Sequence, residues 1–588
     1  MKSRTEKNIL KRSFRFSVSL LNRSQKWGGI IIVILLLINS FLDVFTIASV
    51  LPLVVLLLSP QFILSNKFLK SIYDIIGFNS STDFFIAATC IVILLFIIKN
   101  IVSYFIFHYQ SKYAFSVSAR LSKNMIDHFY TLPYLTITNS DTSIYLNRIV
   151  NTPASYVSNI LLSLFTIFSE GLIFILISTG LLIYNYNIFL LLLLVLTPGT
   201  FLYFSVRKKK LSSLNNSLKS KLPEVLKLAT EAIKGFVEST LFQKQEYFAN
   251  KFDKINKGLN HDYTKLNTAQ GTSIKFIEII VMVGIGILFI YSILFITDKR
   301  ETVLLLSLFV AASYKIVPSV NKIFIAFLNA KTHQYTLDEL SEITNYNPSR
   351  INYNSKPVYL NKNIELKNIS FEYPESSFKL DAPNFFIKKG EKVGIQGQSG
   401  SGKTTLINII IGLIALQKGE ILIDGIKVNA ENIYSWQKLI GYVKQDPFIF
   451  NDSLISNIAV GETPEDFNRD RIKSILNFLN LDSLLNSLPD GLNTNIGEEG
   501  SKLSVGQKQR VAIARVLYSD KEVLIFDEVT SNLDKETEHE VIRSILKIAR
   551  QDKTIIFISH KEEILNTCDK VYRIDNGMVY LEKDTELL

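Results

Sequence analysis

A glycine-rich stretch in the second half of the chain combines the residue types that bind phosphate. It consists of Gly397, Gln398, Ser399, Gly400, Ser401, Gly402, Lys403, Thr404 and Thr405, which match G-x-x-x-x-G-K-T. An apolar run typical of a strand precedes it and an apolar run typical of a helix follows, as this motif requires. Backbone N–H groups and the helix N-terminus would then face an anion. We expect Lys403 to reach the β- and γ-phosphates of a nucleotide and Thr404 to bind Mg²⁺. The alternative is a glycine-rich turn without a ligand.

Two carboxylates end an apolar strand about 130 residues further along the chain. The run 523–526 is apolar, and Asp527 and Glu528 follow it directly. An aspartate in this place suits a Mg²⁺ site, as a direct ligand or through a bound water. A glutamate in this place suits a general base that polarises an attacking water molecule. Such a pair is common by itself, but it is a specific signal in the same domain as a phosphate-binding loop.

A second anion-binding helix start is predicted between the phosphate loop and this pair. Ser504, Gly506 and Gln507 lie directly before a helical segment, 509–515. A serine and a glycine at the start of a helix leave its first N–H groups available to an anion.

Three further polar residues follow strand-like runs in the same region. Gln445 follows 440–444, and His560 ends 554–559 on the sheet edge where ligands bind in α/β folds. Tyr373 ends another apolar run and could stack on an adenine ring. The alternative for Tyr373 is simple packing at the end of a strand.

The elements that must position these residues form only part of the chain. Of the 588 residues, 48% are hydrophobic and the mean hydropathy is +0.23, and the apolar residues crowd into the first 330 positions. A purely soluble protein of this size is less apolar, so we predict a membrane half and a soluble half. The two cysteines lie far apart and imply no disulfide framework.

The membrane half contains six apolar runs long enough to span a bilayer. They are Trp27–Ser59, Phe84–Tyr109, Ile160–Tyr184, Ile188–Val206, Ile274–Ile296 and Thr302–Leu328. A spanning helix needs about 20 apolar residues, so the first run must tilt, bend or project from the bilayer. Pro52 is the expected place of a bend.

The connections between these runs predict the orientation of the chain. The segments 110–159 and 207–273 are long and basic, and their apolar spacing is helical, so we expect membrane helices that continue far into the cytoplasm. Ordinary soluble insertions are the alternative. Residues 1–26 carry eight basic residues against one acidic residue and predict a cytoplasmic amphipathic lead-in. The segment 59–83 predicts an amphipathic helix at the outer face, or a packed loop helix.

The net charge of +11 comes largely from basic segments beside the apolar runs. This placement favours contact with anionic lipid headgroups, and we expect no nucleic-acid partner.

Five charged residues interrupt the apolar runs, where a charge is costly. They are Asp43, Lys99, Glu170, Glu278 and Lys315. One interpretation is that Lys99 and Lys315 line a polar cavity and meet an anionic substrate. The other is an ion pair with one of the three acidic residues, or a lysine that extends to the membrane surface.

We predict four segments in the chain. Residues 1–26 are the lead-in and 27–335 the membrane domain. Residues 336–361 are a polar linker, and 362–588 alternate strand-like and helix-like runs, which is typical of an α/β domain.

Taken together, these motifs resemble those of ATP-binding cassette (ABC) transporters over almost the whole chain. The resemblance implies that 397–404 is the Walker A loop, 523–527 Walker B, 503–507 the signature and 531–534 the D-loop. It makes Glu528 the catalytic carboxylate, Gln445 the Q-loop residue, His560 the switch histidine and Tyr373 the adenine-stacking residue. ATP is then the substrate, with Thr404, Gln445 and Asp527 at Mg²⁺. The implied fold is a six-helix membrane domain of the type I exporter class, joined to an α/β P-loop domain.

This sequence departs from the family pattern at two places. Val505 stands where the signature usually has a glycine, a change that bears on the ATPase rate, while Ser504 and Gly506 are kept. Asn532 replaces the usual small residue of the D-loop.

One cassette per chain implies a homodimer with two composite ATP sites, because the signature in this family serves the partner's nucleotide. The long loops would carry coupling helices, with Leu132–Asp141 and Gly235–Tyr247 as candidates. For the second candidate, a plain helical segment is the alternative. Localisation in the bacterial inner membrane, with multiple spans and both termini in the cytoplasm, follows from the same resemblance and the basic loops.

The first span, the region of Lys99 and the segment 313–322 resemble flippases of lipid-linked oligosaccharides. That resemblance implies a polyprenyl-pyrophosphate glycan as substrate, with Lys99 and Lys315 as its basic contacts. Two alternatives stay open: an exporter of peptide, lipid or drug, and a cassette ATPase with a receptor-like membrane part.

Overall fold

The computed structural model describes residues 9–58, 67–78, 80–184, 186, 189–190, 194, 214, 216–295, 299–343, 356–374, 378–530, 535–548 and 553–584. The chain divides into two units. The first comprises Met1–Leu132 and Asn139–Pro348, and the second comprises Pro133–Thr138 and Ser349–Leu588.

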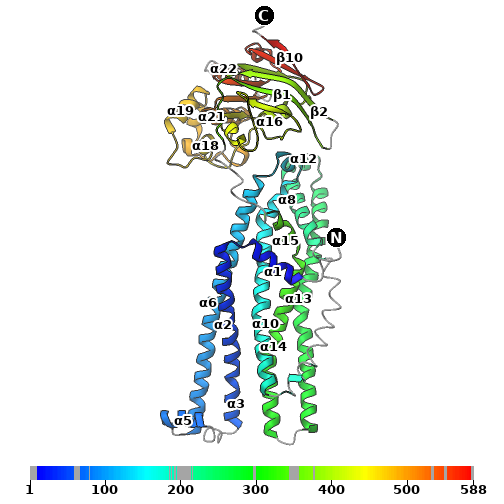
Figure 1. The fold of residues 1–588 in the computed structure, drawn as a ribbon, viewed down its shortest axis with the longest axis vertical. Helices are drawn as coiled ribbons and strands as arrows, with labels where there is room; N and C mark the ends of the chain where they lie inside the picture. The colour runs from blue at the N-terminus through cyan, green and yellow to red at the C-terminus, as the bar shows by residue number, and fades with distance from the viewer. Residues whose placement is uncertain are drawn as a thin grey trace. The chain divides into compact units, whose positions relative to one another are not determined.

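The first unit is helical (Figure 1). Its longer helices are α1 (Ile9–Leu20), α2 (Arg23–Ala48), α3 (Val50–Leu58), α5 (Lys67–Ile76), α6 (Ser81–Phe129), α10 (Leu162–Tyr184), α13 (Gln245–Phe295) and α14 (Lys299–Thr332). Shorter segments are α8 (Thr142–Leu146), α9 (Thr152–Tyr156), α12 (Phe236–Leu241) and α15 (Tyr335–Leu340).

Among the described residues, five helical stretches are long and apolar enough to cross a membrane: Arg23–Leu57, Ser81–Phe129, Thr142–Ile183, Gln245–Ile287 and Ser307–Thr332. They contain or overlap five of the predicted spans, whereas most of the span 188–206 lies outside the described residues. Helix α6 has 49 residues and α13 has 51. At 1.5 Å per residue both exceed ~70 Å, so they continue far past a hydrocarbon core of ~30 Å, as expected for the long connections.

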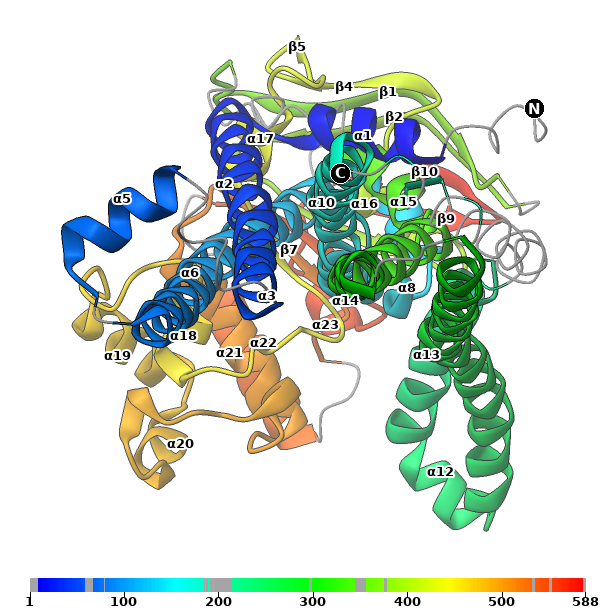
Figure 2. The same cartoon turned by 90° about the horizontal axis from the view of Figure 1, so that it is seen from below.

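The long helices pack along their lengths in neighbouring pairs. Helix α14 lies against α10 and α13, and α2 lies against α6 and α10, as the end-on view in Figure 2 shows. One apolar core joins α10 and α14 through Ile173, Ile177 and Ile316. Burial of such side chains contributes roughly 25 cal/mol per Å² of apolar surface.

In the first long apolar run the helix is interrupted at Ser49, three residues before Pro52. Helix α2 ends at Ala48 and α3 begins at Val50, with Pro52 in the first turn of α3. A proline ring clashes with the carbonyl four residues earlier and offers no N–H to it. For Pro52 that carbonyl belongs to Ala48, which explains why the helix breaks there. The hydroxyl of Ser49 donates to the Thr46 carbonyl oxygen at 2.6 Å, which stabilises the break.

The predicted lead-in and outer segment both contain helices. In α1, Ser13, Ser17 and Leu20 are buried whereas Phe14 and Val18 are exposed. Helix α5 occupies the middle of 59–83 and exposes Ile75 and Ile76.

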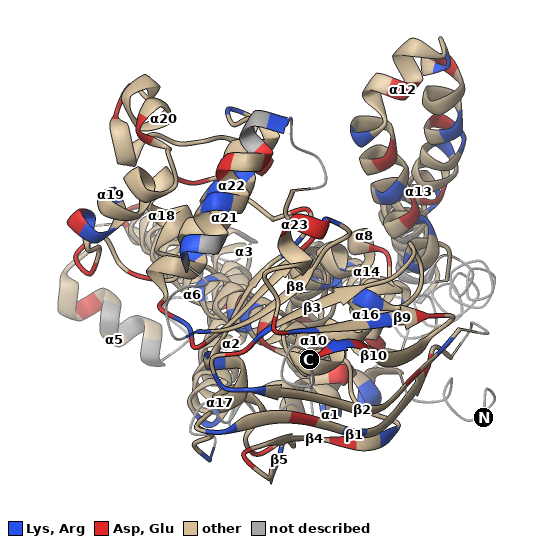
Figure 3. Cartoon of the chain, turned by 90° about the horizontal axis from the view of Figure 1, so that it is seen from above, with Lys and Arg blue, Asp and Glu red and all other residues tan. Residues whose placement is uncertain are grey.

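The second candidate coupling segment, 235–247, forms the turn between two antiparallel helices. Residues 216–234 are helical, and α12 and α13 follow. Figure 3 shows acidic and basic residues interspersed along this hairpin. At its tip the apolar side chains of Phe236, Leu241 and Phe242 are exposed.

The start of the predicted linker 336–361 is folded. Helix α15 and the 3-10 turn Ser341–Ile343 occupy it, and Leu337 and Leu340 are fully buried in the core of the first unit. The sequence prediction relied on the low apolar density of this stretch and overlooked Leu337 and Leu340, which are three residues apart and therefore lie on one face of a helix. Residues 344–355 lie outside the described residues.

The second unit is built on a mixed sheet with the strand order β5-β4-β1-β2-β10-β9-β3-β8-β7-β6 among the described residues. The strands are β1 (Asn363–Glu372), β2 (Lys379–Lys388), β3 (Lys392–Gln396), β4 (Lys418–Ile423), β5 (Ile426–Lys427), β6 (Ile440–Val443), β7 (Val523–Asp527), β8 (Thr554–Ile558), β9 (Lys570–Asp575) and β10 (Met578–Asp584). Strands β3, β8, β7 and β6 are parallel neighbours, whereas β1 pairs antiparallel with β2 and β4. The parallel part is buried on both faces, which fits its continuous apolar runs.

The helices of this unit include α16 (Lys403–Ile410), α17 (Ile433–Lys438), α18 (Leu454–Ile458), α19 (Arg469–Phe478), α20 (Asp482–Ser487), α21 (Val505–Tyr518), α22 (Lys535–Ile548) and α23 (Glu562–Leu565). The short helix α7 (Tyr134–Thr138) also belongs to this unit, because Tyr134 and Leu135 pack against its apolar core. Helix α7 lies inside the first candidate coupling segment, 132–141.

Candidate functional site

The glycine-rich loop joins β3 to α16, in the predicted order of strand, loop and helix. Gly402 caps α16 with a φ of +110°, in the left-handed region that favours glycine. A Cβ at Gly397 would lie only 2.4 Å from the carbonyl oxygen of Ile574, so a larger residue does not fit there. These two positions explain why the loop needs glycine for its shape as well as for anion binding.

Two hydroxyl groups of the loop fit a phosphate and its metal ion. The Ser401 Oγ is buried and has no hydrogen-bond partner among the described residues. A buried hydroxyl without a partner is costly, so a phosphate oxygen at this position would satisfy it. Thr404 lies in the first turn of α16 and is exposed. Its hydroxyl is therefore accessible to Mg²⁺.

Lys403 connects the loop with the end of β7 and the end of β8. Its Nζ donates to the carbonyl oxygen of Gly397 at 2.7 Å and lies 3.4 Å from Glu528 Oε1. It also lies 3.3 Å from His560 Nε2. The lysine side chain is only 8% exposed, so its charge is concentrated on these few partners.

Glu528 and His560 meet at the carboxyl ends of adjacent parallel strands. The Glu528 Oε1 lies 3.5 Å from His560 Nε2. Glu528 adopts a φ of +45°, a conformation that costs about 1–3 kcal/mol for a residue with a side chain. Its backbone N–H donates to the Ile558 carbonyl oxygen at 3.1 Å, which holds it in this geometry. The carboxylate is thereby directed toward Lys403, where a general base would face the phosphate chain.

Asp527, the preceding residue, is almost fully buried. Burial raises the pKa of its carboxyl group, and a hydrogen bond from the Tyr442 hydroxyl at 2.9 Å opposes that rise. Burial likewise raises the pKa of Tyr442, so this phenol stays a donor. A bound divalent cation would favour the ionised carboxylate.

Gln445 and Tyr373 contact other elements of the same unit. The backbone carbonyl of Gln445 accepts a hydrogen bond from the Gln509 side chain of α21. The Tyr373 hydroxyl lies 3.0 Å from Thr405 Oγ1 of α16, and its ring contacts Phe371 edge-on. These contacts match the packing alternative for Tyr373, and its stacking on adenine stays a prediction.

The signature residues form the capped start of α21. The Ser504 Oγ accepts from the Gln507 N–H at 3.3 Å, and the Ser504 N–H donates to Gln507 Oε1 at 2.8 Å. Val505 is 52% exposed, whereas Gly506 is buried. Within the described residues, no hydrogen bond or ion pair joins Ser504 or Gln507 to the Lys403–Glu528 cluster. The D-loop, with Asn532, lies outside the part of the chain that the structure describes.

The charged residues of the apolar spans are paired in the first unit. Lys99 and Lys315 both form ion pairs with Asp43, and the Lys315 Nζ lies 2.8 Å from Asp43 Oδ2. Each lysine side chain is 16% exposed and the aspartate side chain 8%. The two lysines therefore have an acidic partner, as the ion-pair alternative expected. Two positive charges share one negative charge, however, so this group keeps a net positive charge.

The other two acidic residues have partners of their own. Glu170 accepts from Ser319 and from Lys322, both at 2.6 Å, and Glu278 pairs with Lys275 at 3.2 Å on an exposed surface.

Sequence reasoning missed Tyr442 and Gln509, which contact the site from β6 and α21. Tyr442 lies opposite Ile525 in the pairing of β6 with β7. A sequence shows no register between strands that are about 80 residues apart, so only the fold revealed these contacts.

Comparison with known proteins matches both halves of the chain. A family model described as "ABC transporter transmembrane region" matches residues 30–334, and one described as "ABC transporter" matches residues 380–531. An ATP-dependent lipid A-core flippase of Saccharophagus degradans is 27% identical over 493 residues, covering 83% of this chain and 82% of that protein. The flippase of the same description from Francisella novicida is 32% identical over 400 residues, 66% of each chain.

A solved structure of a bacterial Atm1-family ABC exporter with ATP bound superposes with a TM-score of 0.75. It covers 96% of both chains at 18% sequence identity, which shows a common fold.

Proposed function

Because this chain belongs to the ABC transporter family, we propose that two copies of it flip a lipid with an anionic, sugar-bearing headgroup across a bacterial inner membrane. The chain is a multi-pass membrane protein that couples ATP hydrolysis to transport. Within this class of lipids, we propose a polyprenyl-pyrophosphate-linked oligosaccharide as the cargo. Both termini and the long helical extensions lie on the cytoplasmic side in this proposal, by the positive-inside rule.

The ATP site uses the cluster around Lys403. Lys403 and the loop N–H groups bind the phosphates, and Tyr373 contacts the adenine. Glu528 orients and polarises the attacking water, and His560 holds the phosphate end from the neighbouring strand. Thr404, Gln445 and Asp527 would hold Mg²⁺, which supplies charge neutralisation on the phosphates when bound.

A homodimer completes this site. Among the described residues, no hydrogen bond or ion pair joins Ser504 or Gln507 to the phosphate loop of the same chain, yet with Gly506 they form a helix start suited to an anion. A second copy would bring its α21 to the γ-phosphate. In this proposal each copy has a lead-in at residues 1–26, a membrane domain at 27–335, a linker at 336–361 whose first residues pack in the core of the first unit, and a cassette at 362–588.

The observation that carries the cargo assignment is the Asp43 group, the side chains of Asp43, Lys99 and Lys315. Its net positive charge lies within apolar spans, where an unbalanced charge is costly. An anionic headgroup would balance it, and lysines bind phosphate as point charges. Relatives described as lipid A-core flippases support a lipid cargo as well. Export of a peptide or drug is the alternative.

The test uses the full chain in lipid nanodiscs and measures ATP hydrolysis. We expect stimulation by a polyprenyl-pyrophosphate oligosaccharide, and a several-fold higher half-stimulating concentration in Lys99→Gln and in Lys315→Gln. Basal hydrolysis should be unchanged. Single variants are preferred, because removing both lysines would leave Asp43 buried and unpaired at a cost of about 3–5 kcal/mol.

Lys257→Gln is the matched control, since Lys257 forms an exposed pair with Asp253 on α13. Such surface pairs contribute little, and this variant should behave as wild type. Stimulation by peptides or drugs alone would refute the lipid assignment, and stimulation by lipid A-core alone would restrict it to that class.

A further inference from the structure

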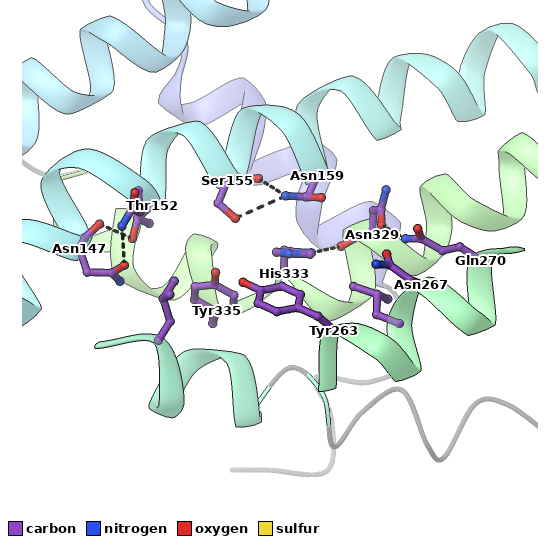
Figure 4. A pocket seen from close by; sticks show the side chains of 13 residues that line it. Asn147, Thr152, Ser155, Asn159, Tyr263, Asn267, Gln270, Asn329, His333 and Tyr335 are labelled. Atoms are coloured by element: carbon purple, nitrogen blue, oxygen red, sulfur yellow. Dashed lines mark hydrogen bonds between the residues drawn. The ribbon is translucent and has the colours of Figure 1, made fainter. Parts of the chain in front are cut away.

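A polar cavity of about 540 Å³ lies in the first unit, apart from the Asp43 group. This volume is within the range of roughly 300–1,000 Å³ for small-molecule sites. Six carboxamide side chains line it, and we call it the carboxamide cavity: Asn147, Asn151, Asn159, Asn267, Gln270 and Asn329. They come from the helical stretch Thr142–Ile183, from α13 and from α14. Figure 4 shows the labelled side chains converging on one space.

The chemistry of this lining is uncharged and rich in both donors and acceptors. None of the described residues that line the cavity is Lys, Arg, Asp or Glu. Tyr263, Tyr335 and His333 add aromatic rings with polar atoms. Burial lowers the pKa of His333, which keeps its ring neutral. A carboxamide both donates and accepts, so it matches pairs of neighbouring hydroxyl groups better than it matches an ion.

Part of this hydrogen-bonding capacity is not used within the protein. The Gln270 Nε2 donates to Asn329 Oδ1 at 2.7 Å, which orients both amides. The side chains of Asn267 and Tyr263, by contrast, have no hydrogen-bond partner among the described residues. Both lie on α13, four residues apart, and therefore on one face of that helix.

The backbone around the cavity is unusual as well. Two π-helical turns, Asn147–Asn151 and Val157–Leu161, flank α9. They carry three of the six carboxamides. Such turns are rare, and they occur mostly at functional sites.

The cavity lies just beyond the apolar part of several spans. Asn159 precedes the predicted span 160–184, Asn267 and Gln270 precede 274–296, and Asn329 follows 302–328. All are at the end that the basic loops assign to the cytoplasm. Asn329 is 14 residues from Lys315 on α14 (329 minus 315), or about 21 Å along the helix.

We propose that the carboxamide cavity binds the uncharged, hydroxyl-rich part of the cargo, a saccharide, while the phosphate end of the headgroup meets the Asp43 group. The identification of this saccharide with the cargo rests on the proposed function. The saccharide site itself rests on the cavity.

The test measures binding of N,N′-diacetylchitobiose, a neutral disaccharide, to the full chain in nanodiscs by saturation-transfer NMR. Wild type should bind it, and Asn267→Ala and Tyr263→Phe should each weaken binding about fivefold, the loss of one hydrogen bond. The matched control is Asn260→Ala, two turns away on α13, where the Asn260 side chain donates to Asn256 and to no other described residue. The saccharide site is overturned if wild type does not bind the disaccharide or if Asn267→Ala binds it as well as wild type does. It is also overturned if wild type binds triglycine more tightly than the disaccharide.

A second measurement separates this inference from the proposed function. Asn267→Ala should raise the half-stimulating concentration of the glycan-bearing lipid and leave that of the bare polyprenyl pyrophosphate unchanged. An unchanged response to both lipids shows that the cavity does not hold the cargo's sugars and overturns the proposal. If neither lipid stimulates wild type, the proposed function fails, and disaccharide binding still decides whether the cavity is a saccharide site.

Discussion

The Asp43 group in the first unit contains two lysines and one aspartate, so one positive charge is left unbalanced. Asp43 accepts from two lysines, each from a different helix. An aspartate that holds both lysines keeps them from repelling each other, and it also competes with any anion that approaches them. The same group therefore explains the stability of charges in apolar helices and would favour the anionic cargo proposed above.

This competition predicts that removing the charge of Asp43 increases the affinity for an anionic lipid. In Asp43→Asn the two lysines lose their internal partner, so an anionic lipid should bind more tightly and stimulate ATP hydrolysis at a lower concentration. The protein should also unfold at a lower temperature, because two like charges are left together. Titration of ATPase activity with the lipid and a thermal melt measure the two effects. A higher half-stimulating concentration in a folded variant would contradict the competition.

At the scale of elements, α15 ties several parts of the first unit together. The Thr152 hydroxyl donates to Glu339 Oε2 at 2.5 Å, and the Gln334 side chain just before α15 donates to Ser13 of α1 at 2.9 Å. Burial raises the pKa of Glu339, with Thr152 opposing the rise. This buried carboxyl makes the stability of the first unit depend on pH.

The sign of that dependence follows from proton linkage. The folded state holds the Glu339 proton more tightly than the unfolded state, so the stabilising contribution is present at low pH. It is lost as the pH rises from about 4.3 through the raised folded pKa. The melting temperature of Glu339→Gln should therefore fall less than that of wild type across this window. Glu246→Gln, a change at an exposed glutamate in the first turn of α13, is the control and should melt as wild type does at each pH.

At the scale of the whole molecule, each cassette contains two separate parts of the proposed ATP site. Lys403, Glu528 and His560 form one cluster, and the capped start of α21, which is the predicted second anion site, lies outside these contacts. The proposed homodimer brings the two together, so nucleotide binding and association should depend on each other.

Glu528→Gln tests this dependence. Removal of the general base should lower ATP turnover by about 10²–10⁴-fold, while binding of ATP persists. Isolated variant chains should then associate more strongly with ATP than without it, as measured by cross-linking or light scattering in detergent. Glu522→Gln, an exposed glutamate just before β7, is a control and should retain turnover. A variant that keeps wild-type turnover, or chains that stay monomeric with ATP, would refute the composite site.

The amino-acid sequence by itself determined the phosphate loop, the carboxylate pair, the apolar spans and the class of fold. These features are local: Lys403 follows its glycines directly, Glu528 follows its strand, and about 20 apolar residues suffice for a span. Tertiary structure alone decided how distant side chains meet. It placed Lys99 and Lys315 on the same Asp43, Tyr442 on Asp527, and six carboxamides from three helical stretches around one cavity. Helix rotation and strand register set those contacts, and a single sequence does not encode either in its local spacing.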